Sequence, residues 1–370
     1  MKLVKVNSPG RAEIIGNHTD YNNGYALSCA ITQSTVVNLK QRPDNQIIAK
    51  SLNPEFPEKV SFSLDKIRRD EKIKWGNYIR GVVSEMLKAG KKIRGAEITV
   101  KTNFSASGGL SSSAAFELGV AYGLLKLAGE KIEPEAVAKL CQKAENGELV
   151  QSPCGFLDQA TIAFAQKGKM VFLDFLPPVK VKLIKAKLPG ASFVVAVDRK
   201  VKRILGESGY PARRKSCEKA AKILKISSLR EVDPERFEKE KSKLDPVTRK
   251  RAEHIVYENQ RVLEAVKVLK AGKVERFGEL LSESGRSALE LYDLAEKTPE
   301  LRFLMETAQK LNGVLGARNM GGGFSAIILA LVRDRVELEF EKELDRKYYN
   351  KYRRHLEFIK FTPSDGVRIA

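Results

Sequence analysis

The sequence has few residues of the kinds that hold disulfide-bonded or metal-dependent folds together. It contains four cysteines and three histidines among 370 residues. The cysteines, Cys29, Cys141, Cys154 and Cys217, are widely spaced and form no Cys-x-x-Cys pair. This spacing excludes a zinc ribbon and a dense disulfide framework, so we expect reduced thiols in a cytoplasmic protein.

Long apolar runs are also missing. No run approaches the ~20 residues that a membrane-spanning helix needs, and Met1 to Asn7 is too short and too alternating for a signal peptide. A hydrophobic content of 42% and a charged content of 30% are typical of a soluble globular protein. We therefore expect no membrane partner.

The positive charge lacks the clustering that nucleic-acid binding requires. The formal net charge is +20, and a basic excess of this size raises the possibility of a nucleic-acid partner. However, Lys and Arg are spread along the chain and interleaved with Glu, as in Glu235 to Lys243, and no aromatic residues alternate with basic blocks. We expect no nucleic-acid partner, whereas a basic field favours an anionic substrate such as a nucleotide.

The chain is long for a single core, which predicts two domains. Its clearest break is Pro177-Pro178, so we predict an N-terminal domain of residues 1–180 and a C-terminal domain of residues 181–370. Periodicity predicts a mixed order without the regular alternation of a Rossmann fold, which indicates an α+β protein. Strands are predicted near residues 4–7, 36–39, 46–51, 59–64, 96–102, 171–175, 181–186, 193–198, 326–332 and 357–361, and helices near 75–88, 114–127, 134–145, 208–218, 247–271, 274–284, 300–311 and from 336.

The most informative segment that is present reads Gly-Gly-Leu-Ser-Ser-Ser-Ala-Ala, from Gly108 to Ala115. It joins a predicted strand to a predicted helix, and a glycine turn at a helix start exposes backbone N–H groups and the positive end of the helix dipole. Such a site binds anions, usually phosphate. The segment lacks the Gly-Lys-Ser/Thr ending of a Walker A loop. Taken alone, the pattern favours a glycine turn with serine helix caps.

Two further polar segments are candidates for chemistry. The stretch from Gly10 to Asp20 could hydrogen-bond a ring of hydroxyls, or it could be a polar turn between two strands. In the segment Cys154 to Gln159, Asp158 could be a base or a positioning group, or it could be a helix N-cap. The polar side chains of the first segment are those of Arg11, Asn17, His18 and Asp20.

The combination and order of these segments resemble the galactokinase branch of the GHMP small-molecule kinases. The resemblance covers most of the chain. It implies a two-domain α+β fold with the active site in the cleft between the domains, and an ATP-dependent sugar 1-kinase that is a monomer or weak homo-oligomer. The matching segments are Gly10-Arg11 with Gly16 to Asn22, Trp75-x-Asn77-Tyr78, Gly109 to Ala115, Cys154 to Gln159, Ser208 to Glu218, Arg251 to Leu263 and Gly321 to Phe324.

The resemblance also implies roles for single residues. Asp158 would act on the anomeric hydroxyl, O1, and Arg11 would lie between Asp158 and the γ-phosphate of ATP. Ser113 and Glu145 would hold Mg²⁺. The sugar would be bound by Asn17, His18, Asp20, Gly155 and Tyr210. Trp75 would lie near the adenine, and the phosphates would be held by Gly108, Gly109, Leu110, Ser111, Ser112 and Ser113.

Departures from the family pattern bear on the sugar. The family usually has Glu where this chain has Asn17, and that side chain usually holds the sugar O6; Ala12-Glu13-Ile14 stands where Val-Asn-Leu is common. The Asn17 amide can accept from O6, and its N–H groups could meet a carboxylate at C6. Galactose is the favoured substrate, with galacturonate, N-acetylgalactosamine or another hexose as alternatives. A non-catalytic sugar-binding regulator is disfavoured because Arg11, Asp158 and Ser113 are all present.

Overall fold

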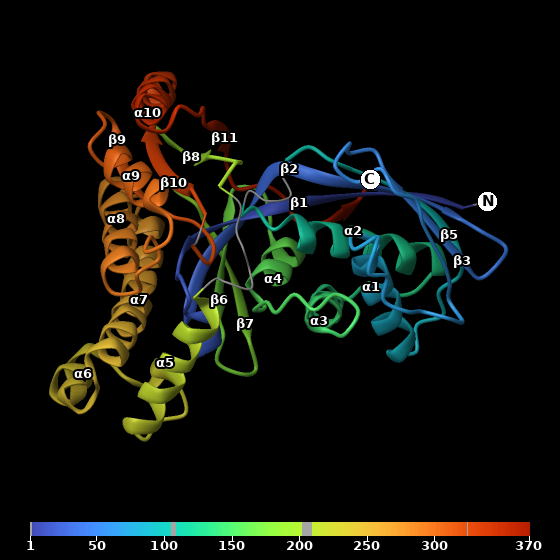
Figure 1. Ribbon diagram of the computed structural model, residues 1–370, viewed down its shortest axis with the longest axis horizontal. Helices are drawn as coiled ribbons and strands as arrows, with labels where there is room; N and C mark the ends of the chain where they lie inside the picture. Colours follow the sequence, from blue (N-terminus) through green and yellow to red (C-terminus); the bar gives the residue numbers. More distant parts are fainter. Residues whose placement is uncertain (1, 105–108, 202–208, 324) are drawn as a thin grey trace.

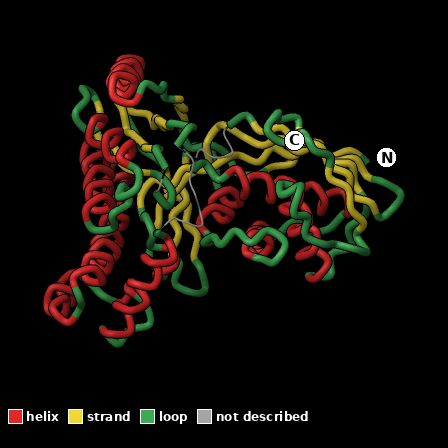
Figure 2. Tube along the Cα trace, viewed as in Figure 1, coloured by secondary structure: helices red, strands yellow, loops and turns green. Residues whose placement is uncertain are grey.

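The computed structural model describes residues 2–104, 109–201, 209–323 and 325–370, with the backbone alone for Tyr210. Two β-sheets and the helices packed on them form two lobes, as expected for an α+β protein (Figures 1 and 2). The strands of the described residues are β1 Leu3–Ile15, β2 Tyr25–Gln41, β3 Gln46–Ser51, β4 Val60–Ser63, β5 Ala96–Thr102, β6 Lys169–Asp174, β7 Lys180–Lys185, β8 Ala191–Val197, β9 Val314–Asn319, β10 Ile327–Arg333, β11 Glu357–Phe361 and β12 Arg368–Ile369.

The longest helix begins at residues that favour a helix start. Asp245 precedes the longest helix and accepts a hydrogen bond from the Thr248 N–H, and Pro246 occupies the first helical position. None of the helices in the described ranges is long and apolar enough to cross a membrane. The helices are α1 Gly76–Lys88, α2 Ser112–Ala128, α3 Pro134–Asn146, α4 Leu157–Phe164, α5 Tyr210–Ile223, α6 Pro234–Glu240, α7 Pro246–Ala271, α8 Val274–Glu290, α9 Pro299–Ala308 and α10 Glu337–Tyr352.

The first lobe is built on a sheet of order β12-β1-β2-β5-β3-β4, extended by β6 and β7 beside β2. Its centre is the long antiparallel pair β1 and β2. Helices α1 to α4 lie on one side of this sheet, with α2 packed directly on β1 and β2 (Figure 1). The loop before α2 therefore opens next to β1.

The second lobe contains an antiparallel sheet of order β11-β8-β10-β9. Its central strands are buried on both faces, because alternate residues of β8 enter two different apolar cores: Phe193 and Val195 enter one, Val194 and Ala196 the other. Helix α7 also contacts β1, β2 and β7, which places the second lobe against one end of the first sheet.

The predicted division at residue 180 falls at the first residue of β7, and β7 pairs with β6 in the first sheet. The chain end returns to that sheet as well, because β12 pairs with β1, and both termini lie over it in Figure 1. We therefore propose that the boundary lies between β7 and β8, and that the last residues belong to the first lobe.

The first strand is longer than its sequence indicates. A strand was predicted only near residues 4–7, and a polar turn was one alternative for Gly10 to Asp20, whereas β1 continues to Ile15 and pairs with β2 at Arg11↔Ala30 and Glu13↔Ser28. Irregular pairing flanks this stretch on both sides but not between Arg11 and Glu13. The prediction was wrong because polar side chains two residues apart on a strand share one face, which here points to the candidate site and not to a core. Polar residues in a sequence do not by themselves distinguish such a strand from a loop.

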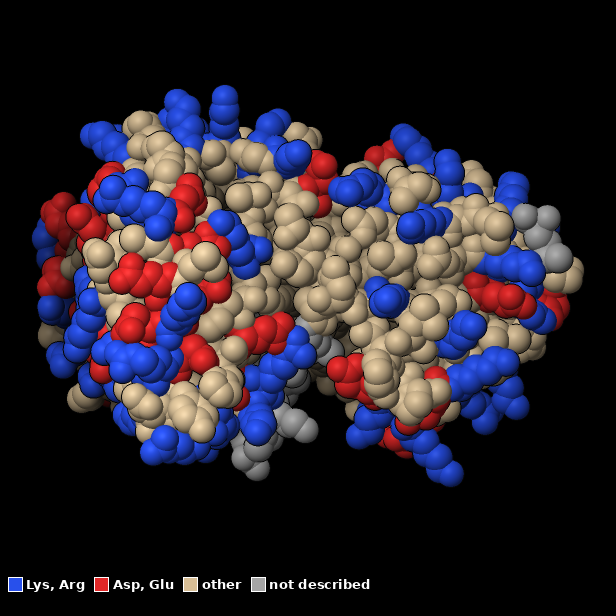
Figure 3. Space-filling model, turned by 90° about the horizontal axis from the view of Figure 1, so that it is seen from above, with Lys and Arg blue, Asp and Glu red and all other residues tan. Residues whose placement is uncertain are grey.

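Basic side chains are distributed over the surface. In the view of Figure 3, Lys and Arg cover both lobes and alternate with Asp and Glu, and the waist between the lobes is largely uncharged on this face. The interleaving seen in the sequence is thus maintained in space.

Candidate active site

Arg11 connects three elements at the junction of β1, the loop before α2, and α4. Its Nε donates to Asp158 Oδ1 at 2.6 Å, and its Nη1 donates to the carbonyl oxygen of Gly109 at 2.7 Å. Its backbone N–H donates to the carbonyl oxygen of Leu110 at 3.0 Å. The side chain of Arg11 is 8% exposed and that of Asp158 is 26% exposed. The two residues predicted to be catalytic therefore form one ion pair. The loop before α2, which was predicted to hold the phosphates of ATP and is called the phosphate loop below, lies against this pair.

Asp158 is held by both of its oxygens. Ser111 Oγ donates to Oδ2, opposite the contact of Oδ1 with Arg11. Asp158 is the second residue of α4, after the N-cap position of Phe156. The alternative that Asp158 caps this helix is thus wrong, and its carboxylate is available to the site.

The loop before α2 has the backbone shape that an anion site requires. Gly109 has φ +64°, and Ser111, the N-cap residue of α2, has φ +58°, a conformation uncommon for a residue other than glycine. The Ser111 side chain makes no capping hydrogen bond. The serine-cap alternative is therefore wrong for this residue. The first N–H groups of α2 have no acceptor within the helix, so this end favours an anion.

The predicted metal ligands lie together. Burial raises the pKa of Glu145 to about 6, a hydrogen bond with Ser113 opposes that shift, and the charge of Asp158 adds to it. Gln159 Nε2 donates to Glu145 Oε2 at 2.7 Å, and Cys154 Sγ lies 3.4 Å from the same oxygen. One carboxylate and a hydroxyl, completed by substrate phosphates, match the ligand set of Mg²⁺. Within the described ranges no group of three or more His, Cys, Asp or Glu forms a closed metal site.

A second buried carboxylate, Glu117, lies beside this pair and was missed in the sequence analysis. Its two oxygens are buried and lie close to the side chains of Gln159 and Glu145, without a hydrogen bond of good geometry to either in the described part of the chain. Burial raises its pKa well above the ordinary value, and the charge of Glu145 raises it further. The sequence did contain a sign of this residue, because Glu117 is the one acidic residue in the largely apolar α2 and lies one turn after Ser113.

Asp20 and Gly155 are brought into contact. A Cβ atom on Gly155 would lie 1.8 Å from Asp20 Oδ2, so only glycine allows this carboxylate its position. Burial raises the pKa of Asp20 to about 6, and the negative charges of Glu13 and Asp158 contribute. The sugar motif and the segment around Asp158 therefore share one carboxylate-lined region.

His18 faces the second lobe. Its Nε2 lies 3.2 Å from the carbonyl oxygen of Gly322, and its Nδ1 lies 3.0 Å from the hydroxyl of Tyr21. The residue has φ +61° and is buried. The glycine-rich turn after β9 thus approaches another loop of the protein, one of the two possibilities that consecutive glycines raise.

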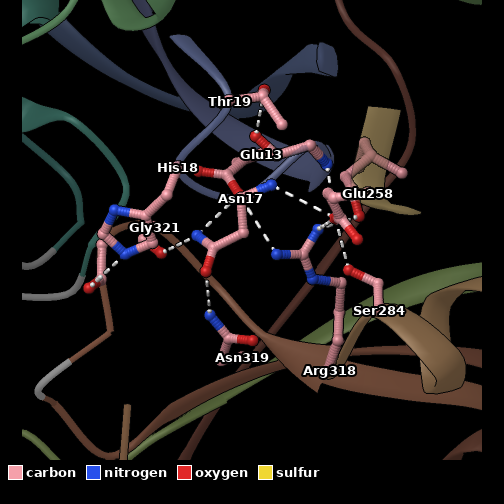
Figure 4. Close-up of polar contacts among 12 residues, drawn as sticks. Glu13, Asn17, His18, Thr19, Glu258, Ser284, Arg318, Asn319 and Gly321 are labelled. Atoms are coloured by element: carbon pink, nitrogen blue, oxygen red, sulfur yellow. Dashed lines mark hydrogen bonds and ion pairs between the residues drawn. The ribbon is translucent and has the colours of Figure 1, made fainter. Parts of the chain in front are cut away.

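Asn17 is engaged on every side (Figure 4). Its Nδ2 donates to Glu13 Oε1 at 3.1 Å and to the carbonyl oxygen of Gly321 at 2.6 Å. Its Oδ1 accepts from Asn319 Nδ2 at 3.2 Å, and its carbonyl oxygen lies 3.2 Å from His254 Nε2. The residue is 1% exposed. Both amide hydrogens are used within the protein, so no N–H of Asn17 is available to a carboxylate at sugar C6.

Glu258 anchors the same loop from α7. Its Oε1 accepts from the N–H groups of Gly16 and Asn17, at 3.0 and 3.2 Å, and from Ser284 Oγ at 2.6 Å. Burial alone would raise the pKa of Glu258, but the nearby cation of Arg261 leads the charges that hold it well below the ordinary value. No role was predicted for this residue, because nothing in its own segment shows that it reaches the sugar motif.

The remaining predicted residues are placed in part. Trp75 precedes α1 and packs against Phe56 and Phe116, with ring centroids 6.5 and 6.1 Å away; Phe116 is on the first turns of α2, so this aromatic patch lies beside the phosphate loop. Gly108 and the side chain of Tyr210 lie outside the part of the structure that is described.

The chain is similar to galactokinases and other GHMP kinases in sequence and in structure. The family models "Galactokinase galactose-binding signature", "GHMP kinases N terminal domain" and "GHMP kinases C terminal" match residues 4–41, 77–166 and 265–350. A galactokinase of Thermotoga maritima is 34% identical over 365 residues, 99% of each chain, and one of Clostridium tetani is 36% identical over 350 residues, 93% of this chain and 87% of that protein. The crystal structure of Lactococcus lactis galactokinase complexed with galactose matches with a TM-score of 0.93 at 33% identity, covering 99% of this chain and 95% of that one.

Proposed function

The chain belongs to the galactokinase family of the GHMP kinases, and on this basis we propose that it transfers the γ-phosphoryl group of ATP to the anomeric hydroxyl, O1, of galactose. The observation that carries the proposal is the constellation of Arg11, Asp158 and Ser111 against the loop before α2. This arrangement combines a fixed carboxylate, a fixed cation and an anion-binding helix end.

Phosphoryl transfer depends mainly on positioning and on neutralising charge. With one oxygen bonded to Arg11 and the other to Ser111, Asp158 cannot turn freely and is oriented to accept the O1 proton. The Arg11 guanidinium, held by Gly109 and Asp158, is placed to neutralise charge that develops on the transferring oxygens. Their fixed geometry means that little reorganisation is needed during the reaction.

The phosphates of ATP are proposed to lie at the first turn of α2, with the adenine toward the aromatic patch of Trp75, Phe56 and Phe116. Ser113 and Glu145 would hold Mg²⁺. When bound, the ion neutralises phosphate charge and helps to align the phosphoryl group. The protein's own contribution is to keep Glu145 in place through Gln159.

The charges around the sugar region favour a neutral hexose. Besides burial, the charges of Glu13 and Asp158 raise the pKa of Asp20, and the charge of Asp158 raises that of Glu13, so an added carboxylate on the sugar would meet like charges. The amide of Asn17 offers no free N–H to compensate. Galactose is therefore preferred over galacturonate, while N-acetylgalactosamine and other hexoses are alternatives for a direct test.

A sugar panel assayed for ATP consumption, with the product position read by NMR, tests this function. We expect galactose to be phosphorylated at O1 with the highest kcat/KM, and galacturonate to react poorly. Phosphorylation at another hydroxyl, or of another sugar only, would contradict the proposed reaction. Sugar binding by calorimetry without any ATP consumption would indicate the non-catalytic regulator instead.

We further propose a cytoplasmic protein that is a monomer or weak homo-oligomer and has no nucleic-acid partner. All four cysteines are free, three of them buried, and the visible basic side chains are dispersed (Figure 3). Sedimentation over a concentration range tests the assembly. A shift assay at several salt concentrations tests nucleic-acid binding, which would weaken steeply with salt.

A further inference from the structure

We propose that Glu13, and not Asn17, is the side chain of the sugar motif that accepts a hydrogen bond from a hydroxyl of the substrate. The inference rests on the proposed function, since it concerns the same sugar site. It assigns a specificity role to a residue that the sequence analysis treated only as a departure from the family pattern.

The first observation is that the Asn17 amide is buried and bonded within the protein at its oxygen as well as at its nitrogen. Its two amide hydrogens go to Glu13 and Gly321, its Oδ1 accepts from Asn319, and it is 1% exposed. Releasing these bonds for a sugar would leave buried polar groups unpaired, which costs more than the new bond returns. Asn17 therefore acts as a bridge between the lobes (Figure 4).

The second observation is the direction in which Glu13 faces. Glu13 lies two residues after Arg11 on β1, and the pairing with β2 is regular between them, so both side chains leave the same face of the sheet. Arg11 reaches Asp158 on that face. Burial raises the pKa of Glu13, the charge of Arg11 lowers it, and the charge of Asp158 raises it. The charge of Glu13 in turn raises the pKa of Asp20. Glu13 thus lies among the groups proposed for the sugar and its O1.

The third observation is an unused carboxylate oxygen. Glu13 Oε1 accepts from Asn17 Nδ2 at 3.1 Å and from Arg318 Nη2 at 3.2 Å. Its Oε2 accepts no hydrogen bond from the residues that the structure describes, although the side chain is only 8% exposed. This oxygen is not fully buried, so a ligand donor can reach it, and a carboxylate oxygen in a largely buried side chain is normally hydrogen-bonded.

Arg318 fixes the carboxylate in that orientation. It is fully buried, its Nη1 donates to the carbonyl oxygen of Ile14 at 3.1 Å, and its Nη2 pairs with Glu13. A carboxylate accepts hydrogen bonds but donates none when ionised. The ligand group at Glu13 Oε2 is therefore a neutral hydroxyl, and an anionic substituent at that position of the sugar is excluded by charge.

Binding of galactose and its 2-, 3-, 4- and 6-deoxy forms, measured by calorimetry on the full-length protein, tests the inference. Glu13→Gln keeps the size of the side chain and removes its charge. In the parent protein we expect one deoxy sugar to bind at least roughly tenfold more weakly than galactose because it lacks the hydroxyl that a charged acceptor holds. In Glu13→Gln that difference should shrink to about threefold or less, while the other deoxy penalties stay unchanged.

Asn17→Ala is the matched control, since it removes the neighbouring side chain of the same motif. We expect Asn17→Ala to lower the melting temperature and to weaken the binding of all these sugars by a similar factor, so that the parent's pattern of deoxy penalties remains. The inference is overturned if Glu13→Gln keeps every penalty, or if Asn17→Ala and not Glu13→Gln abolishes one. Should Glu13→Gln not fold, Glu13→Asp retains the charge beside Arg318 with a shorter reach, and must reduce the same penalty.

The proposed function and this inference fail in different ways. If the parent phosphorylates no sugar, the kinase proposal fails, and the binding comparison still decides the role of Glu13. If the parent phosphorylates galactose and the penalties are the same in Glu13→Gln, the inference alone fails. Galacturonate gives an independent readout, because its affinity relative to galactose should rise in Glu13→Gln.

Discussion

At the scale of single residues, the site is defined by carboxylates whose partners differ. Asp158 is held by Arg11 and Ser111, Glu145 by Gln159 and Ser113, and Glu13 by Asn17 and Arg318. Because each carboxylate has its own fixed donors, each is suited to one of the proposed roles: Asp158 to accept the O1 proton, Glu145 to hold Mg²⁺ and Glu13 to accept from a sugar hydroxyl. Two of these tasks lead to predictions about single side chains.

The replacement Asp158→Asn is expected to lower kcat by about 10²–10⁴-fold, the usual contribution of a positioned base. Galactose affinity should change little, because the amide keeps the size of the side chain. The control is Asp174→Asn, which alters another partly buried carboxylate paired with an arginine, Arg230, at 2.7 Å. Turnover measured under saturating ATP and galactose should be near normal in the control. A near-normal kcat for Asp158→Asn would remove its catalytic assignment.

The raised pKa of Asp20 predicts an acid limb in sugar binding. The pKa is raised from 3.8 to about 6, so Asp20 is ionised and able to accept sugar hydrogen bonds above that pH. As pH falls through about 6, protonation removes this acceptor, and kcat/KM for galactose should fall by about tenfold per pH unit.

The pH profile of Asp20→Asn provides the check. The assay uses saturating Mg²⁺, which would keep Glu145 ionised although its pKa is also raised to about 6. The kcat/KM of Asp20→Asn should then be low throughout and should lack the inflection near pH 6. The negative groups that face Asp20 are those of Glu13 and Asp158, so Glu13→Gln should move the inflection to lower pH. An unchanged inflection in Asp20→Asn would assign the titration to another group.

At the scale of elements, the first turn of α2 and the loop before it act together. Arg11 binds the carbonyl groups of Gly109 and Leu110, which turns the loop's oxygens toward β1 and leaves the N–H groups of the helix start for an anion. A Cβ at Gly10 would lie 2.8 Å from the Leu110 oxygen. The close packing of β1 against the loop therefore depends on glycine at position 10.

We expect Gly109→Ala to weaken ATP binding by roughly tenfold, because a side chain strains this left-handed residue and crowds the phosphate approach. Gly109 has φ +64°, and its added Cβ would meet Ile327 at 3.3 Å. Gly129→Ala is a matched control at the other end of α2, with φ +73° and open space around it. Both variants should lose about 1 kcal/mol of stability from the strained backbone. Calorimetry showing equal ATP affinities for the two variants would return the loop to a purely structural role.

At the scale of the whole molecule, the sugar motif is also the joint between the lobes. Residues of the first lobe from Glu13 to His18 bond to α7, to β9 and to the glycine turn after it (Figure 4). Many of these contacts lie in fully buried surroundings. We therefore expect sugar binding and the relative position of the lobes to be coupled through the same hydrogen bonds.

The coupling predicts two effects of Glu258→Ala. It removes the acceptor of the Gly16 and Asn17 N–H groups and leaves the Arg261 cation without its partner. Breaking a buried pair in this way should cost about 3–5 kcal/mol of unfolding free energy, and the KM for galactose should rise more than the KM for ATP. The control, Glu306→Ala, breaks the exposed pair with Arg302 and should cost at most about 1 kcal/mol. Denaturant unfolding that shows equal losses would contradict the anchoring role of Glu258.

The sequence by itself determined several of the strands and the residue types that identify the family. The predicted strands at residues 46–51, 96–102 and 357–361 coincide with β3, β5 and β11, because alternation and turn residues act locally. The resemblance to the galactokinase branch is confirmed by the family models and the full-length relatives. The order of the motifs was sufficient to recognise the family, because that recognition needs only the residue types and their order along the chain and not their contacts in space.

Only the tertiary structure decided which of these residues face the site and which are already engaged. Asn17 is bonded to residues 302 and 304 positions away, Asn319 and Gly321, while Glu13, four residues before it, retains an oxygen for a ligand. Glu258 meets the motif across 241 residues. The physical reason is that burial and hydrogen-bond saturation arise from segments remote in the chain, so local residue types could place a carboxylate and an amide in the motif but could not say which of the two is free to bind.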